Sequence, residues 1–167
     1  MERNAESARD QGAAGLDLET ASQMAAKALA LGQESLWSSF LQLDNGLARY
    51  RRGDYAGAVD AMGKVIGQPM NVGRPLPPLE RDVAAYAVLA MAQHQLKQTG
   101  AARESLAKAT DLAETKLPHL GTNDLERDWV DWLIAHIFLR EAKTVLGGES
   151  TTSGTQTANP AMQFNRR

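Results

Sequence analysis

Residues 46–59, GLARYRRGDYAGAV, decide how this sequence folds. Gly53 follows a run with helical apolar spacing and predicts the end of that helix, because glycine commonly lies just past a helix end. Asp54 follows at once and can cap another helix. The stretch therefore predicts two helices separated at Gly53. Its three arginines allow a second interpretation, in which the stretch binds a phosphate or a carboxylate.

The three arginines, Arg49, Arg51 and Arg52, fit a solvated helix end better than a ligand site. Cations near a helix C-terminus offset the negative pole of the helix dipole. Consecutive positions also spread around a helix, so these side chains do not all face one ligand. We therefore expect a structural unit of a repeating scaffold here, with an anion site as the weaker alternative.

Apolar residues recur every three or four positions through most of the chain, which predicts an all-α fold. No alternating stretch is long enough to predict a strand. Asp17 can cap a first helix that ends near Gly32, and Asn123 or Asp124 can cap the last. Four prolines and two glycines in residues 67–80 forbid a continuous helix there. The remaining helices are expected over about residues 35–52, 55–66, 80–98 and 100–117, and the last ends near Leu146.

Both ends of the sequence lack the pattern of a folded core. Residues 1–15 show no hydrophobic periodicity, and residues 147–167 are rich in Gly, Ser, Thr and Gln. Such segments bury too little apolar surface to offset the entropy of ordering. We predict a disordered N-terminal segment 1–15, a helical domain 16–146 and a disordered polar tail 147–167.

Composition argues against several classes of protein. Eighteen Lys and Arg residues against twenty Asp and Glu give a net charge of −2, without the basic face of a nucleic-acid or membrane-surface protein. The absence of cysteine excludes disulfides, thiolate catalysis and cysteine-ligated metals. The first residues are unlike a secretory signal, and no apolar stretch approaches the roughly 20 residues of a membrane span. We expect a cytoplasmic protein that binds neither nucleic acid nor membrane.

The residues that could support catalysis are sparse. No two of the histidines His94, His119 and His136 lie three or four residues apart, so the sequence contains no two-histidine helical metal site. Asp128 and Asp131 are one helical turn apart and could act as paired acids, but negative charge is favoured in a first helical turn anyway. We expect no enzyme activity, no metal and no cofactor. A small hydrolase that uses the two aspartates is the remaining enzyme hypothesis.

Small residues recur at a fixed offset. Ala48, Ala58 and Met62 are followed 44 residues later by Ala92, Ala102 and Leu106. A small residue is required where two antiparallel helices cross closely, and larger residues fill the groove one or two turns later. The offset therefore predicts two similar helix pairs.

Residues 46–66, GLARYRRGDYAGAVDAMGKVI, resemble a tetratricopeptide repeat, a helix pair with a period of about 34 residues. A second unit, VLAMAQHQLKQTGAARESLAKA at 88–109, departs from the pattern with Lys97 where Gly53 stands and Thr99 where Tyr55 stands. The proline-rich segment accounts for the longer offset. The likeness in the first unit is carried by Gly46, Ala48, Tyr50, Gly53, Tyr55 and Ala58.

The resemblance implies about six helices in antiparallel pairs, stacked as a short superhelix. The first helix would be the second helix of a repeat whose first helix is missing. An apolar edge of the stack would then be uncovered, which allows self-association. The last helix would cap the array, with a buried stripe formed by Trp129, Trp132, Ile134, Phe138 and Leu139.

A narrower resemblance concerns the second unit together with DWLIAHIFLREAKTVL at 131–146. This combination is similar to the repeat segment that follows serine/threonine kinase or other signalling domains in planctomycete-type bacterial proteins. The sequence has no kinase motif of its own. The narrower resemblance implies a regulatory or assembly tail, or a fragment, of a larger bacterial signalling protein.

The broader resemblance implies a protein-interaction module that binds a peptide in its concave groove. The groove would be mostly apolar with one arginine, which favours an apolar or aromatic peptide. The positions carried over from the family are Phe40, Leu43, Leu47, Tyr50 and Arg51 in the first unit, and Ala84, Ala87, Val88, Met91, His94 and Gln95 in the second.

Overall fold

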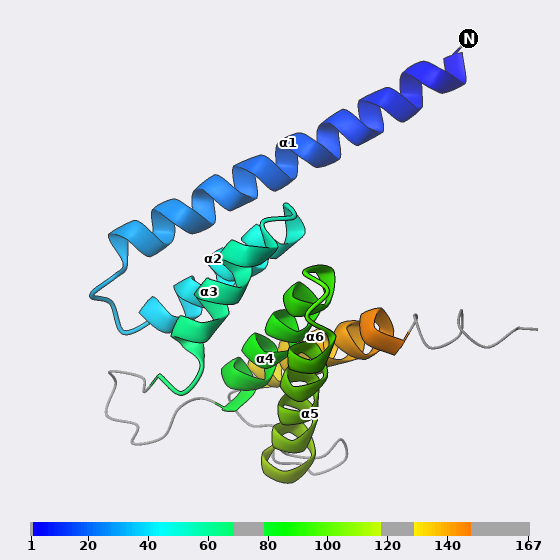
Figure 1. Cartoon of the computed structure of the whole chain (residues 1–167). Helices are drawn as coiled ribbons and strands as arrows, with labels where there is room; N and C mark the ends of the chain where they lie inside the picture. Colours follow the sequence, from blue (N-terminus) through cyan, green and yellow to red (C-terminus); the bar gives the residue numbers. More distant parts are fainter. Residues whose placement is uncertain (1, 69–78, 118–128, 148–167) are drawn as a thin grey trace, which may run out of the picture.

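The computed structural model describes residues 2–68, 79–117 and 129–147, with side chains from Asp17 onward (Figure 1). These residues form six helices and no strand, which confirms the predicted all-α fold. The helices are α1 (Glu2–Leu31), α2 (Ser38–Arg51), α3 (Tyr55–Val65), α4 (Leu79–Gln95), α5 (Thr99–Lys116) and α6 (Trp129–Gly147).

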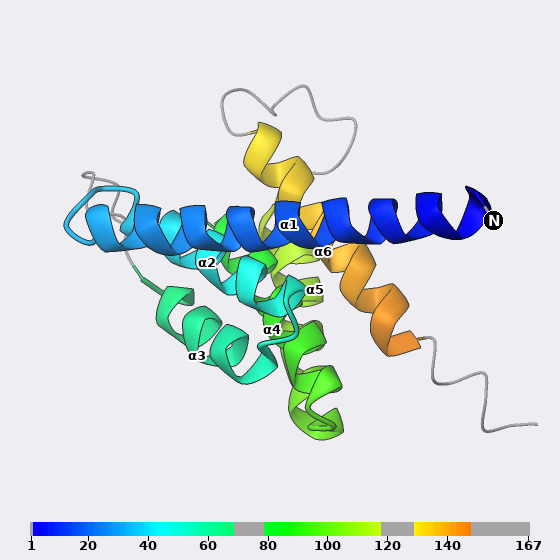
Figure 2. The ribbon, with the colours of Figure 1, turned by 90° about the horizontal axis from the view of Figure 1, so that it is seen from above.

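The helices form two neighbouring pairs with one helix added on each side. α2 pairs with α3, and α4 pairs with α5, while α3 and α4 join the two pairs. α1 lies along α2, and α6 crosses the pair of α4 and α5 and packs mainly on α4 (Figures 1 and 2). α4 is the central helix, because it contacts α2, α3, α5 and α6.

The turns within the two pairs have the same backbone. Gly53 has φ 82° and Lys97 has φ 62°, so both adopt the left-handed conformation. Gly53 N donates to Tyr50 O at 3.0 Å, and in the second turn Lys97 N donates to His94 O at 2.9 Å. Two further hydrogen bonds of each turn also match at this 44-residue offset, all at 2.9 Å. Asp54 N donates to Arg49 O, as Gln98 N does to Gln93 O. Ala58 N donates to Asp54 O, as Ala102 N does to Gln98 O.

Small residues allow the helices to cross closely. A Cβ on Gly46 would overlap the Met62 side chain and lie 2.9 Å from the Ala61 Cβ, so α2 and α3 require glycine at this crossing. In the second pair the equivalent position is Ala90, which is completely buried. The core that results joins α2, α3 and α4 to Ala142 of α6, and a second cluster joins α4 and α5 to Trp132 and Ala135.

A buried ion pair fixes the start of α4. The Arg81 side chain is fully buried, and its guanidinium donates to Asp82 Oδ1 at 2.7 Å and to Ser39 Oγ of α2 at 2.7 Å. It also donates to Gln68 O at 2.7 Å, while Asp82 Oδ2 accepts from Gly67 N at 3.2 Å. These bonds join α2, the segment after α3 and α4. No local sequence pattern predicted these bonds.

The structure differs from the predicted boundaries mainly in α1. The backbone is helical from Glu2, so Asp17 lies inside α1 and is not its cap, and residues 2–15 are helical where a disordered segment was predicted. Alanine, glutamate, arginine and glutamine are strong helix formers, and they are frequent in this segment. Asp54 does cap α3, since its Oδ1 accepts from Gly57 N at 2.9 Å.

The predicted buried stripe of the last helix is only partly correct. Trp132 and Leu139 are buried and Phe138 is partly buried, but Trp129 is 53% exposed and Ile134 is 38% exposed. The buried face of α6 instead follows positions 132, 135, 139 and 142, which is one regular helical stripe. The predicted caps Asn123 and Asp124, and the predicted tail beyond Gly147, lie outside the described residues.

Candidate functional site

A cavity of about 360 Å³ lies between α2, α4 and α6. We call it the central pocket. α4 and α6 line it with residues from their first halves, and α2 lines it along positions 40–47. It is formed by Phe40, Leu43, Asp44, Leu47, Glu80, Arg81, Ala84, Asp131, Ile134 and Phe138.

Most of the residues that line the central pocket are apolar, and we call this apolar part of the lining its floor. Phe40, Leu43 and Leu47 lie three and four residues apart, so they share one face of α2. Ile134 and Phe138, which are also four residues apart, contribute from α6. Such a floor with a few polar groups is typical of sites that bind apolar side chains.

Three carboxylates also line the central pocket. Asp44 of α2, Glu80 of α4 and Asp131 of α6 all line the central pocket. Burial raises the pKa of the Asp44 carboxyl above its usual value, and among the described residues no cationic side chain pairs with it. The charge of Arg81 is offset by its buried pair with Asp82. The central pocket therefore favours cations beside apolar groups.

The structure divides the predicted groove residues into two sets. Phe40, Leu43 and Leu47 line the central pocket, together with Ala84, and Arg51 and Gln95 are exposed. The second set is buried in the helical core, where a peptide has no access in this structure. It consists of Tyr50, Ala87, Val88, Met91 and His94.

α6 contributes to the burial of part of the second set. α6 packs on α4, where its Ala142 and Phe138 join the core cluster that contains Met91 and Tyr50. The sequence showed a helix at this position but not the face of α4 on which it packs. Arg51 is held over the same junction, because its guanidinium makes two hydrogen bonds to Glu141 of α6, at 2.5 and 2.7 Å.

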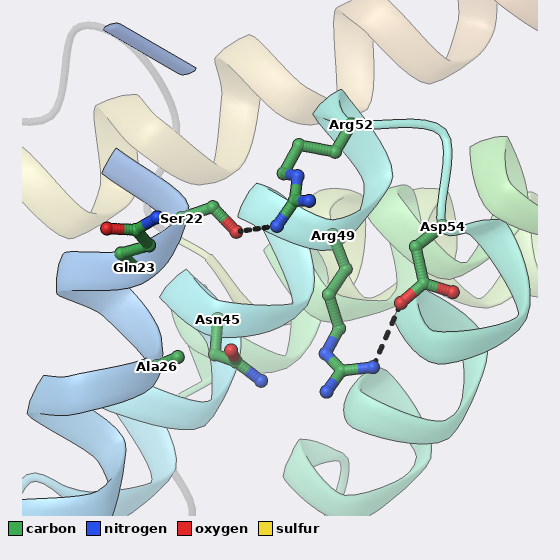
Figure 3. A pocket seen from close by; sticks show the side chains of 7 residues that line it. All are labelled: Ser22, Gln23, Ala26, Asn45, Arg49, Arg52 and Asp54. Carbon is green, nitrogen blue, oxygen red and sulfur yellow. Dashed lines mark hydrogen bonds and ion pairs between the residues drawn. The ribbon is translucent and has the colours of Figure 1, made fainter. Parts of the chain in front are cut away.

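Arg49 and Arg52, the other two arginines of residues 46–59, line a second cavity of about 270 Å³ between α1 and α2 (Figure 3). Arg49 pairs with Asp54 at 2.9 Å. Arg52 donates to Ser22 Oγ at 3.0 Å and pairs with Glu19 at 3.0 Å. Figure 3 shows the two guanidinium groups engaged with different elements.

The three arginines therefore do not form one anion site. Arg49 binds the start of α3, Arg51 binds α6 and Arg52 binds α1, and each already has a carboxylate partner. Their arrangement agrees with the interpretation of the stretch as a structural unit. Gly57 contributes to it, because a Cβ there would overlap both the Asp54 carboxylate and the Arg49 guanidinium.

The catalytic candidates are not brought together by the part of the chain that the structure describes. His136 Nε2 is buried without a hydrogen-bond partner there, and burial together with Lys143 lowers the pKa of its imidazole. Asp131 lines the central pocket, but Asp128 and His119 lie outside the described residues. Within the described ranges, no three His, Asp or Glu side chains are placed to hold a metal ion.

Comparison with family models, curated proteins and solved structures finds no match for this chain. Among the described residues, no helix has both the length and the apolar character needed to cross a membrane. Function is therefore inferred from the central pocket and its residues.

Proposed function

We propose that this chain is a protein-interaction module of the tetratricopeptide type, without catalysis of its own, and that its central pocket binds a peptide segment. Two helix pairs with the same turn at a 44-residue offset support a repeat architecture. Such repeats bind extended or helical peptides on surfaces formed by the first helix of each pair.

The observation that carries this proposal is that apolar side chains and carboxylates line the same pocket. The floor of Phe40, Leu47 and Ile134 suits an apolar or aromatic side chain. Asp44 and Glu80 suit a lysine or arginine next to it. The preferred ligand is therefore a peptide with one or two large apolar residues and a neighbouring basic residue.

A second candidate function is supported by the exposed face of α6. The chain would be a regulatory or assembly segment of a larger bacterial signalling protein, and another domain would cover this face. Scattered exposed apolar residues are normal, but a cluster on one helix marks an interaction surface. The exposed apolar residues of α6 are Trp129, Val130, Leu133, Ile134 and Ile137.

Selection from a library of random peptides tests the first candidate. The full chain should enrich peptides that combine Phe, Met or Leu with Arg or Lys. Binding should shift the NMR methyl signals of Leu47 and Ile134. The double variant Asp44→Asn with Glu80→Gln should bind these peptides about five- to thirtyfold more weakly, because each pocket carboxylate contributes roughly 0.5–1 kcal/mol.

A matched control is available on the outer surface. Asp60 and Glu104 each form an exposed pair with a lysine four residues later. Asp60→Asn with Glu104→Gln removes the same charge and should leave peptide affinity unchanged. Enriched peptides that leave the Leu47 and Ile134 signals unshifted would refute the central pocket as the binding site.

A further inference from the structure

We propose that a segment of this same chain, residues 160–167 with the sequence PAMQFNRR, binds in the central pocket and competes there with an external peptide. This inference rests on the proposed function, because it names an occupant of the same pocket. The segment lies outside the described residues. Its chemistry, the lining of the pocket and the length of chain between them all favour binding there.

Charge favours this pairing. Arg166 and Arg167 give the segment two positive charges, and the sequence contains no acidic residue after Glu149. The central pocket presents the carboxylates of Asp44 and Glu80. Asp131 also lines the pocket but already has an interaction of its own, so the other two carboxylates supply the charge complementarity.

Apolar side chains favour it as well. Met162 and Phe164 are two residues apart, so an extended backbone places both on the same side. The pocket floor offers Phe40, Leu47 and Ile134 to such a pair, and its volume of about 360 Å³ falls within the usual range for small ligand sites. Every residue between Glu149 and Ala158 is Gly, Ser, Thr or Gln. Met162 and Phe164 are therefore the only large apolar residues in the sequence after Leu146.

The chain is long enough for the segment to reach the pocket. Ile134 precedes Gly147, the last residue of α6, by about 20 Å of helix. From Gly147 to Met162 the chain can span about 50 Å when fully extended. A polar spacer of this length has a root-mean-square span of roughly 20 Å, which matches the distance to be covered.

This match of lengths affects occupancy. A tethered ligand has its highest effective concentration, typically millimolar, when the span of the linker equals the separation of the sites. A segment with an affinity of only about 1 mM in a separate peptide would therefore fill about half of the pockets. At half occupancy the tethered segment would raise the apparent Kd of an external peptide about twofold, and a higher occupancy would raise it further.

A spin label on the segment tests the inference in the full chain. The sequence contains no cysteine, so Gln163→Cys provides a single attachment site. The label should increase the relaxation rates of the Leu47 and Ile134 methyl signals several-fold. The Ala101 methyl signal should change much less, because Ala101 lies beside the opposite end of α4.

Two double variants, with a third as control, establish the cause of the extra relaxation. Met162→Ser with Phe164→Ser in the labelled chain should remove the extra relaxation at Leu47 and Ile134. Asp44→Asn with Glu80→Gln should reduce it, whereas Asp60→Asn with Glu104→Gln should not. Unchanged relaxation in the Met162→Ser, Phe164→Ser chain would overturn the inference, as would the absence of broadening at Leu47 and Ile134.

The experiment also separates this inference from the proposed function. Spin-labelled chains are mixed with isotopically labelled chains that carry no spin label. Broadening of equal size in that mixture would show that the segment binds a second copy, which overturns the intramolecular proposal. If the segment leaves the pocket signals unaffected while selected external peptides still shift them, only the further inference fails. If neither affects them, both fail.

Discussion

The turn between α2 and α3 and the turn between α4 and α5 share a backbone conformation but not the side chains that support it. In the first turn Gly53 takes the left-handed conformation, and Asp54 caps α3 while pairing with Arg49. In the second turn Lys97 takes that conformation, and Gln98 at the N-cap makes no side-chain capping bond.

The difference shows where each helix pair obtains its stability. The first turn is favoured locally, because glycine adopts positive φ without strain and aspartate satisfies a free backbone N–H. The second turn requires a lysine in a conformation that costs about 1 kcal/mol. Packing offsets this cost, because α4 is buried on nearly all sides and its start is held by Arg81 and Asp82.

The largest effect is expected from breaking the buried ion pair of Arg81 and Asp82, which holds the start of α4. Asp82→Ala leaves the Arg81 guanidinium buried without its carboxylate, which should lower the free energy of unfolding by about 3–5 kcal/mol. Urea denaturation followed by circular dichroism measures this loss. The double variant Arg81→Met with Asp82→Ala removes both charges and should recover most of it. Equal losses in the single and double variants would show that the ion pair itself is not the anchor.

A somewhat smaller effect is expected at the crossing of the first pair. Gly46→Val adds a side chain where even a Cβ would overlap Met62, and should cost about 2–3 kcal/mol in the same assay. Gly63→Ala is the matched control, because a Cβ at position 63 would point into open space. That control should stabilise the chain by about 0.5–1 kcal/mol, since alanine is the better helix former. If both substitutions destabilise equally, close packing at Gly46 is not the cause.

The smallest effects are expected from substitutions at the left-handed residues of the two turns. Lys97→Gly should stabilise the protein by up to about 1 kcal/mol, because it removes the strain of φ 62°. Gly53→Ala should destabilise it by about 1–2 kcal/mol, because it introduces that strain at φ 82°. Thermal unfolding of both variants measures the two shifts. A loss of stability in Lys97→Gly would mean that the lysine side chain stabilises the turn by more than its backbone costs.

Local patterns predicted much of the helical fold and part of the candidate site. The periodic apolar residues indicated the helices, and Asp54 was identified as a cap from its place after Gly53. Phe40, Leu43 and Leu47 were assigned to one lining face of α2, and they line the central pocket. Their shared face follows from the sequence, because residues three or four positions apart on one helix lie on the same side.

The remaining features depend on contacts between distant residues. Ile134 was predicted to lie in a buried stripe, yet it is partly exposed in the central pocket, because the rotation of α6 is set by its packing on α4. Met91 and His94 were predicted to line the groove, yet they are buried. Arg81 carried no local signal of burial, because its partner Ser39 lies 42 residues away.

By itself, the sequence determined that this protein is helical, that two of its helix pairs share a 44-residue offset and that a capped turn begins at Gly53. These properties follow from backbone propensity and from spacing within one helix, which are local. Only the tertiary structure decided which side of α4 receives α6, and therefore which apolar residues form the core and which line the central pocket. Both sides of α4 are apolar in sequence, so the choice depends on how whole helices fit together.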